Sequence, residues 1–191
     1  MRIACLQFAP KVADISNNIT RADAVLSKAD ADDLENLDLL VLPEMALSGM
    51  DTPRAAELWL TGPGYNFRSQ EHIEPHVEPT ASGVSSQWAR TAARKYSCTV
   101  AVGYPERVGT AGQGQEPDYY NSLIVVDQDG EKLANYSKSF LYYTDATWAR
   151  EGPGFYGGTL GTLGQTAMGI CKCSASHPNN VWLTVPGMDI K

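Results

Sequence analysis

The sequence lacks the features that place a protein in a membrane, on a nucleic acid or outside the cell. Its first residues, MRIACLQFAPKVAD, are apolar over too short a stretch for a signal peptide, and no later window is long and apolar enough to span a bilayer. It has no basic run, and its net charge of −7 argues against a nucleic-acid or anionic-membrane surface. These absences predict a soluble, cytoplasmic protein.

Cysteine is also sparse. The four cysteines are Cys5, Cys98, Cys171 and Cys173, and only the last two lie close together. Without a secretory signal they are better interpreted as free thiols than as a disulfide framework. The length of 191 residues suits one domain with a real core, so we predict a single domain over 1–191.

The sequence does contain an alternation of strands and helices. Helices are predicted from near Asn17 and over 82–96, and 65–79 is predicted to be a loop. The sequence Asp127-Gln128-Asp129-Gly130 predicts a hairpin turn. The strand–helix–strand order at the start predicts a parallel pair, and hence an α/β fold with a mixed sheet. The predicted strands cover 2–8, 37–42, 98–104, 119–126, 131–137 and 165–171.

The stretch LDLLVLPEMALSG, residues 37–49, holds the first candidate functional residue. Its six apolar residues suit a buried strand, and Pro43 ends that strand because it cannot donate to a ladder. Glu44 follows where the chain leaves the sheet, a common position for catalytic groups in α/β folds. A carboxylate beside an apolar core is prepared for general base catalysis, although Glu44 could also simply turn into solvent.

Two further polar residues, Lys138 and Cys171, stand at the ends of predicted strands. A thiol becomes a useful nucleophile as the thiolate, which a neighbouring ammonium or carboxylate base favours. Taken singly, Lys138 is typical of a surface lysine and Cys171 of a small core residue. Together with Glu44 they indicate a nucleophilic site.

Two metal sites are alternatives. Cys171, Cys173 and His177 form C-x-C-x3-H, which lacks a fourth zinc ligand at the usual spacing. His72 and His76 would share a helical face, but Pro75 argues against a helix there, so both are predicted to be loop residues. Neither alternative is favoured.

Three segments carry a family resemblance: LVLPEMALSG, NYSKSFLYYTDATWAREGPGF and LGQTAMGIC. They resemble the signature segments of the nitrilase superfamily of carbon–nitrogen hydrolases. The stretch around the second segment is similar to fungal amidases that act on N-terminal Asn and Gln. The resemblance implies a four-layer α-β-β-α sandwich, with Glu44 as general base, Lys138 as cationic stabiliser and Cys171 as nucleophile. It also implies that Glu151 is a second glutamate supporting the lysine.

The resemblance further implies a reaction that needs no metal or organic cofactor. The implied substrates are protein or peptide N-termini carrying Asn or Gln. An amidase or carbamoylase of small free amides remains an alternative, as does a non-catalytic fragment that associates with other chains.

Two segments, 50–64 and 172–187, depart from the family pattern and are interpreted as insertions. Family members run from a Ser-Gly like Ser48-Gly49 directly into Tyr-Asn-Phe, and from the cysteine directly into a segment like Met188-Asp189-Ile190. The family domain also continues for roughly another hundred residues, so the chain is expected to be incomplete at its C-terminus. An uncovered half-domain would favour association, which leaves a homo-oligomer open.

We predict that both segments are retained introns. Gly49-Met50 and Cys171-Lys172 can each encode an intron start, Leu60-Thr61 and Leu183-Thr184 a branch site, and Pro63-Gly64 and Pro186-Gly187 an intron end. Excision removes 15 and 16 codons, preserves the frame and restores the family pattern at both joints. Lys191 followed by a stop would be a third misread boundary.

If so, the chain as written lacks the backbone after the nucleophile and is expected to be inactive. Sequencing the transcript tests this prediction. A mature message that keeps both segments and stops after Lys191 would refute it.

Overall fold

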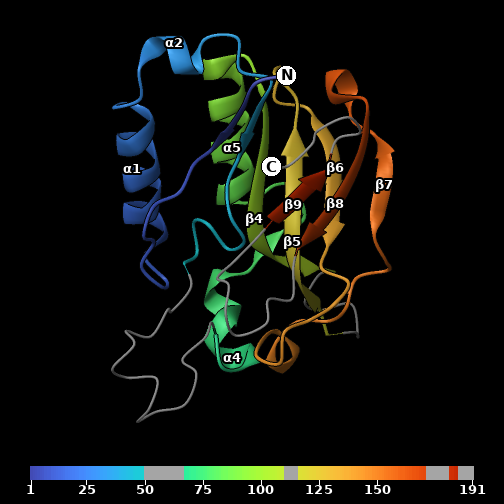
Figure 1. The fold of residues 1–191 in the computed structure, drawn as a ribbon. Helices are drawn as coiled ribbons and strands as arrows, with labels where there is room; N and C mark the ends of the chain where they lie inside the picture. The colour runs from blue at the N-terminus through green and yellow to red at the C-terminus, as the bar shows by residue number, and fades with distance from the viewer. Residues whose placement is uncertain (50–66, 110–115, 171–180, 185–191) are drawn as a thin grey trace.

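A computed structural model describes residues 1–49, 67–109 and 116–170, together with the backbone of 181–184 (Figure 1). The helices are α1 (Ile15–Leu26), α2 (Ala31–Leu34), α4 (Gln70–Ile73) and α5 (Val84–Tyr96), with 3-10 turns η1 (Glu74–His76), η2 (Asp145–Thr147) and η3 (Gly161–Leu163). The strands are β1 (Ile3–Cys5), β2 (Leu39–Val41), β3 (Glu78–Pro79), β4 (Thr99–Val108), β5 (Asp118–Val126), β6 (Lys132–Ser137), β7 (Tyr156–Thr159), β8 (Gln165–Ile170) and β9 (Val181–Thr184).

The larger sheet is mixed and follows the order β1-β2-β4-β5-β6, with β3 paired to the far end of β4. The pairs β1–β2 and β2–β4 are parallel, as the strand–helix–strand order predicts, because a crossover helix returns the chain in the same direction. The pairs β4–β5 and β5–β6 are antiparallel.

The hairpin predicted at 127–130 joins β5 to β6. The Gly130 amide donates to the Asp127 carbonyl at 2.9 Å, and the Asp127 side chain accepts from the Asp129 and Glu131 amides at 3.0 and 2.8 Å. An Asp side chain that bonds to the following backbone in this way favours a tight turn. The short turn makes β6 the immediate neighbour of β5, and so places Lys138 beside that strand.

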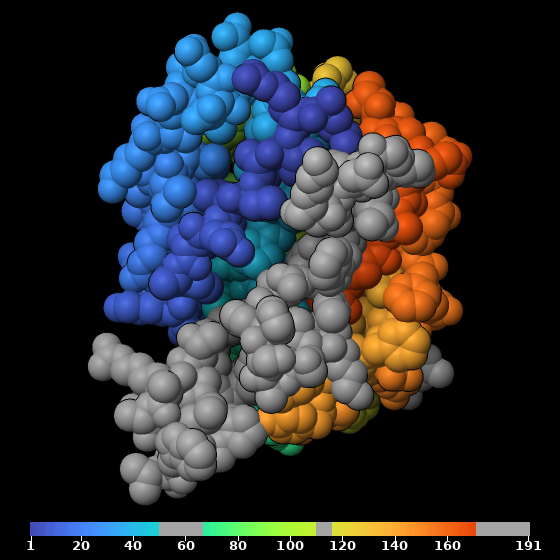
Figure 2. Space-filling model, viewed as in Figure 1, coloured from blue at the N-terminus to red at the C-terminus, as the bar shows by residue number. Residues whose placement is uncertain are grey.

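Each face of the larger sheet buries its own core. On one face Leu40, Val100 and Ile124 pack against Ala22 of α1 and Trp88 of α5. On the other face Leu39, Leu123, Val125 and Tyr136 pack against Met168 and Ile170 of the smaller sheet, β7-β8-β9. Figure 1 shows α1 and strand β7 at opposite sides of the molecule, and the blue and orange segments of Figure 2 lie at the same two sides. The predicted α/β fold is therefore confirmed, and the described residues build three of the four expected layers.

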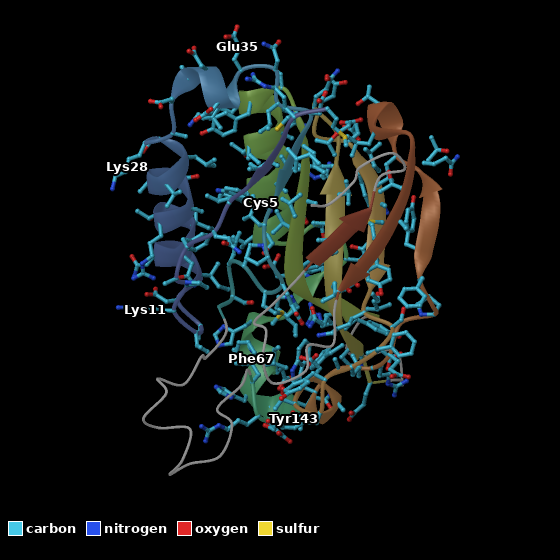
Figure 3. The ribbon with its side chains drawn as sticks, in the orientation of Figure 1. Cys5, Lys11, Lys28, Glu35, Phe67 and Tyr143 are labelled. Carbon is cyan, nitrogen blue, oxygen red and sulfur yellow. The ribbon has the colours of Figure 1, made fainter. Side chains whose placement is uncertain are left out.

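The segment around His72 and His76 is helical, which corrects the loop predicted there. Ser69 caps α4 by accepting from the His72 amide at 3.2 Å, and Pro75 lies in the first positions of η1, where no intrahelical N–H is required. Both imidazole rings pack on the buried Phe67, at centroid distances of 5.1 and 5.5 Å. Figure 3 shows Phe67 at the end of the molecule where α4 lies.

The predicted insertion 50–64 lies outside the described residues. Of 172–187, only the backbone of 181–184 is described, as strand β9 antiparallel to β8. No helix in the described part of the chain has the length and apolar character needed to cross a membrane.

Candidate functional site

The chain leaves β2 after Val41 and, at Glu44, crosses over β4. A Cβ atom placed on Gly103 of β4 would lie 2.8 Å from the Glu44 Cα and 2.9 Å from the Met45 nitrogen, closer than real Cβ contacts allow. Glycine at 103 therefore lets the chain pass over β4 toward β5. Ala101, two residues earlier, packs in the core between the sheets, so Glu44 crosses on that face.

The backbone turns sharply directly after Glu44. Met45 has a φ of 53°, in the left-handed region, and its side chain is fully buried. Such a conformation in a non-glycine residue costs on the order of 1 kcal/mol and persists only where the surrounding contacts impose it. Here the Met45 carbonyl accepts from the Gly49 amide at 2.9 Å. The turn fixes the direction in which Glu44 projects.

Lys138 directly follows β6, and hydrogen bonds of its backbone amide and carbonyl groups hold it in place. Its amide donates to the Asn121 carbonyl at 2.8 Å, and its carbonyl accepts from the Gly152 amide at 2.8 Å. A Cβ at Gly152 would lie 2.1 Å from the Ser137 carbonyl oxygen, so only glycine fits there. The lysine backbone is therefore held between β5 and the returning chain.

The side chains of Glu44, Lys138 and Asp145 form one buried ionic cluster. The Lys138 Nζ lies 2.6 Å from Glu44 Oε1 and 2.7 Å from Asp145 Oδ2, and all three side chains are at most 1% exposed. Asp145, at the start of η2, also accepts from the Tyr142 amide at 3.2 Å. One buried ammonium is thus shared between two carboxylates.

Asn121 of β5 completes this arrangement from a third strand. Its Nδ2 donates to Glu44 Oε1, the same oxygen that Lys138 contacts. Its side chain is fully buried, and its Oδ1 has no hydrogen-bond partner among the described residues. The amide therefore orients the carboxylate while it keeps one acceptor unused.

The cluster shifts the pKa of two of its members. Burial raises the pKa of Glu44 above its ordinary value, against the opposing effect of Lys138 and with a further increase from Asp145. Burial alone would lower the pKa of Lys138, but Glu44 and Asp145 outweigh it and raise that pKa. Lys138 therefore stays an ammonium, while Glu44 takes up a proton more readily than an exposed glutamate would. A buried carboxylate of this kind suits a general base.

The structure brings Glu44 and Lys138 together but places Asp145, and not Glu151, against the lysine. Glu151 is exposed and forms no ion pair among the described residues, because the chain beside it docks through the backbone of Gly152. The predicted supporting contact of Glu151 with Lys138 is therefore wrong. Asp145 and Asn121 were missed, although Asp145 is the first acidic residue after Lys138 and Asn121 interrupts an apolar strand.

Cys171 lies outside the described residues, directly after the last residue of β8, as do Cys173 and His177. Of the described cysteines, Cys5 is exposed, while burial raises the pKa of the Cys98 thiol to about 11, which leaves it unreactive. The described residues contain no group of three or more His, Cys, Asp or Glu that could hold a metal ion.

A comparison of the chain with known families agrees with the α/β fold. The carbon–nitrogen hydrolase family matches residues 2–188, and the chain belongs to this family.

Within the family the chain is similar to N-terminal amidases. It is 33% identical over 174 residues to the protein N-terminal amidase of Schizosaccharomyces pombe, covering 90% of this chain and 54% of that protein. It is 28% identical over 149 residues to the protein N-terminal amidase of Saccharomyces cerevisiae, covering 78% and 28%. A crystal structure of an N-terminal amidase superimposes with a TM-score of 0.66 at 28% identity, over 82% of this chain and 32% of that one. The chain thus spans only about half or less of each of these proteins.

Proposed function

We propose that this protein is a cysteine amidohydrolase that converts N-terminal Asn and Gln to Asp and Glu. The observation that carries the proposal is the buried cluster in which Lys138 contacts Glu44 at 2.6 Å and Asp145 at 2.7 Å. A base with a raised pKa can activate a thiol, and a fixed ammonium can stabilise the oxyanion that forms during amide hydrolysis. Crystal structures of N-terminal amidase with Asn-Glu and Gln-Gly peptides support the choice of substrate.

The roles follow from the chemistry of each group. Glu44 takes the proton of the Cys171 thiol, and the thiolate attacks the side-chain amide carbon of the substrate. The Lys138 ammonium stabilises the resulting oxyanion, a contribution typically worth about 3 kcal/mol for one such donor. Glu44 then protonates the departing ammonia and activates the water that hydrolyses the thioester. Asn121 and Asp145 hold the base and the ammonium in place.

The test uses the full-length protein translated from the mature transcript. It is expected to release ammonia from peptides that begin with Asn or Gln, and to lose this activity when the α-amine is acetylated. Equal turnover of small free aliphatic amides would favour the alternative amidase, and no ammonia from any of these amides would overturn the proposal.

A further inference from the structure

A second buried carboxyl group, that of Glu106, lies on β4 behind the proposed site. Its side chain is 1% exposed and accepts hydrogen bonds from four side chains on three other segments. The donors are Thr80 Oγ1 at 2.5 Å, Ser122 Oγ at 2.5 Å, Asn135 Nδ2 at 3.0 Å to each oxygen, and Ser137 Oγ at 3.5 Å. The mechanism uses none of these residues.

The Glu106 cluster occupies the opposite face of the strands that carry the site. Glu106 shares its face of β4 with Tyr104, which packs in the core between sheet and helices, whereas Gly103 and Glu44 meet on the other face. On β5, Ser122 directly follows Asn121, and on β6, Ser137 directly precedes Lys138. The two serines are partners in the β5–β6 ladder, and their hydroxyl groups lie 3.2 Å apart. Ser122 and Ser137, which both donate to Glu106, are therefore the direct neighbours in the chain of the site residues Asn121 and Lys138.

We propose that Glu106 is a positioning residue for the active site: its carboxyl group ties β5 to β6 and so sets the relative position of Asn121 and Lys138. The inference rests on the proposed function for its effect on catalysis. Small displacements matter there, because a misplacement of about 1 Å between reacting groups can reduce a rate about 100-fold.

The hydrogen bonds leave little freedom for a replacement. Two contacts orient the Asn135 amide: its Oδ1 accepts from the Tyr104 hydroxyl at 2.7 Å, and its Nδ2 donates to the Glu106 carboxyl group at 3.0 Å. In Glu106→Gln an NH₂ group replaces one of the two carboxyl oxygens that accept hydrogen bonds. A side chain that donates to that oxygen then loses its acceptor. Changing Asn135 to Asp at the same time gives the new NH₂ group an acceptor.

The chain offers a matched control in Glu78, which pairs in register with Glu106 on the adjacent strand β3. Glu78 is also buried, and it accepts from the Ser85 hydroxyl at 2.7 Å and the Ser85 amide at 2.8 Å. Its partner Ser85 lies in the first turn of helix α5 and does not adjoin a site residue. Glu78→Gln therefore removes a comparable carboxylate with no link to β5 or β6.

The experiment compares the two variants in the full-length protein by thermal unfolding, steady-state kinetics on an Asn-initiated peptide, and hydrogen exchange at the Lys138 amide. Both are expected to lower Tm by a similar few degrees. Only Glu106→Gln is expected to reduce kcat, about 10- to 100-fold, with KM within about twofold of wild type. It alone is expected to accelerate exchange at Lys138, and Glu106→Gln with Asn135→Asp is expected to recover most of kcat.

Unchanged kcat in Glu106→Gln would overturn the inference, as would an equal loss in Glu78→Gln or no recovery in the double variant. If the wild-type protein released no ammonia, the proposed function would fail. The exchange rate at Lys138 would then decide the positioning role by itself, since it requires no substrate.

Discussion

Replacing Lys138 by methionine in the full-length protein is expected to abolish the proposed amide hydrolysis and to lower the free energy of unfolding by about 3–5 kcal/mol at neutral pH. The variant keeps the length of the side chain but leaves the buried carboxylates of Glu44 and Asp145 without their shared ammonium. Ammonia release and chemical denaturation measure the two effects. Lys28→Met, at an exposed lysine beyond α1 (Figure 3), is the control and should change neither.

The stability loss in Lys138→Met should depend on pH with a defined sign. The pKa of Glu44 is already raised by burial, and it rises further when the ammonium is removed. A carboxyl group whose folded pKa exceeds its unfolded value contributes stability below the unfolded pKa and loses it as the pH rises through the folded pKa. The deficit should therefore be smaller near pH 5 than near pH 8. Adding Asp145→Asn should recover part of the stability without activity, and an unchanged unfolding curve at both pH values would contradict the ionic cluster.

Asp145→Asn is expected to reduce kcat/KM by about 100-fold, whereas Glu151→Gln should leave it within about twofold of wild type. Asp145 holds the Lys138 ammonium at 2.7 Å from a fully buried position, while Glu151 is exposed. The two acidic residues lie six positions apart in the chain, and the pair of variants separates their roles. A loss in Glu151→Gln as large as that in Asp145→Asn would restore the sequence-based assignment.

The pH profile of Asp145→Asn gives a further readout. The negative charge of Asp145 raises the pKa of Glu44, so its removal should lower that pKa. If Glu44 is the general base, the acidic limb of kcat/KM moves to lower pH in the variant. A general loss of folded protein would reduce activity at every pH but would not move that limb.

Short-range patterns in the sequence determined the larger sheet. The apolar run before Pro43, the helix between β1 and β2, and the turn at 127–130 each act over a few residues, and the structure has the predicted parallel pair and hairpin. The same patterns do not fix which side chains of a helix are buried. In the helix predicted over 82–96, α5 buries the small side chains of Ala89, Ala92 and Ala93, whereas its first residue, Val84, is 44% exposed.

For the candidate site, the sequence alone determined that Glu44 and Lys138 stand at the ends of buried strands, since apolar runs and Pro43 mark where each strand stops. Only the tertiary structure decided which residues meet the lysine. Asp145 reaches Lys138 because the chain turns back at η2, and Asn121 reaches Glu44 because Gly103 lets the chain cross β4. These contacts depend on the direction of the folded chain and on the space that Gly103 leaves because it has no side chain. Residue types and their spacing along the sequence do not encode either of these.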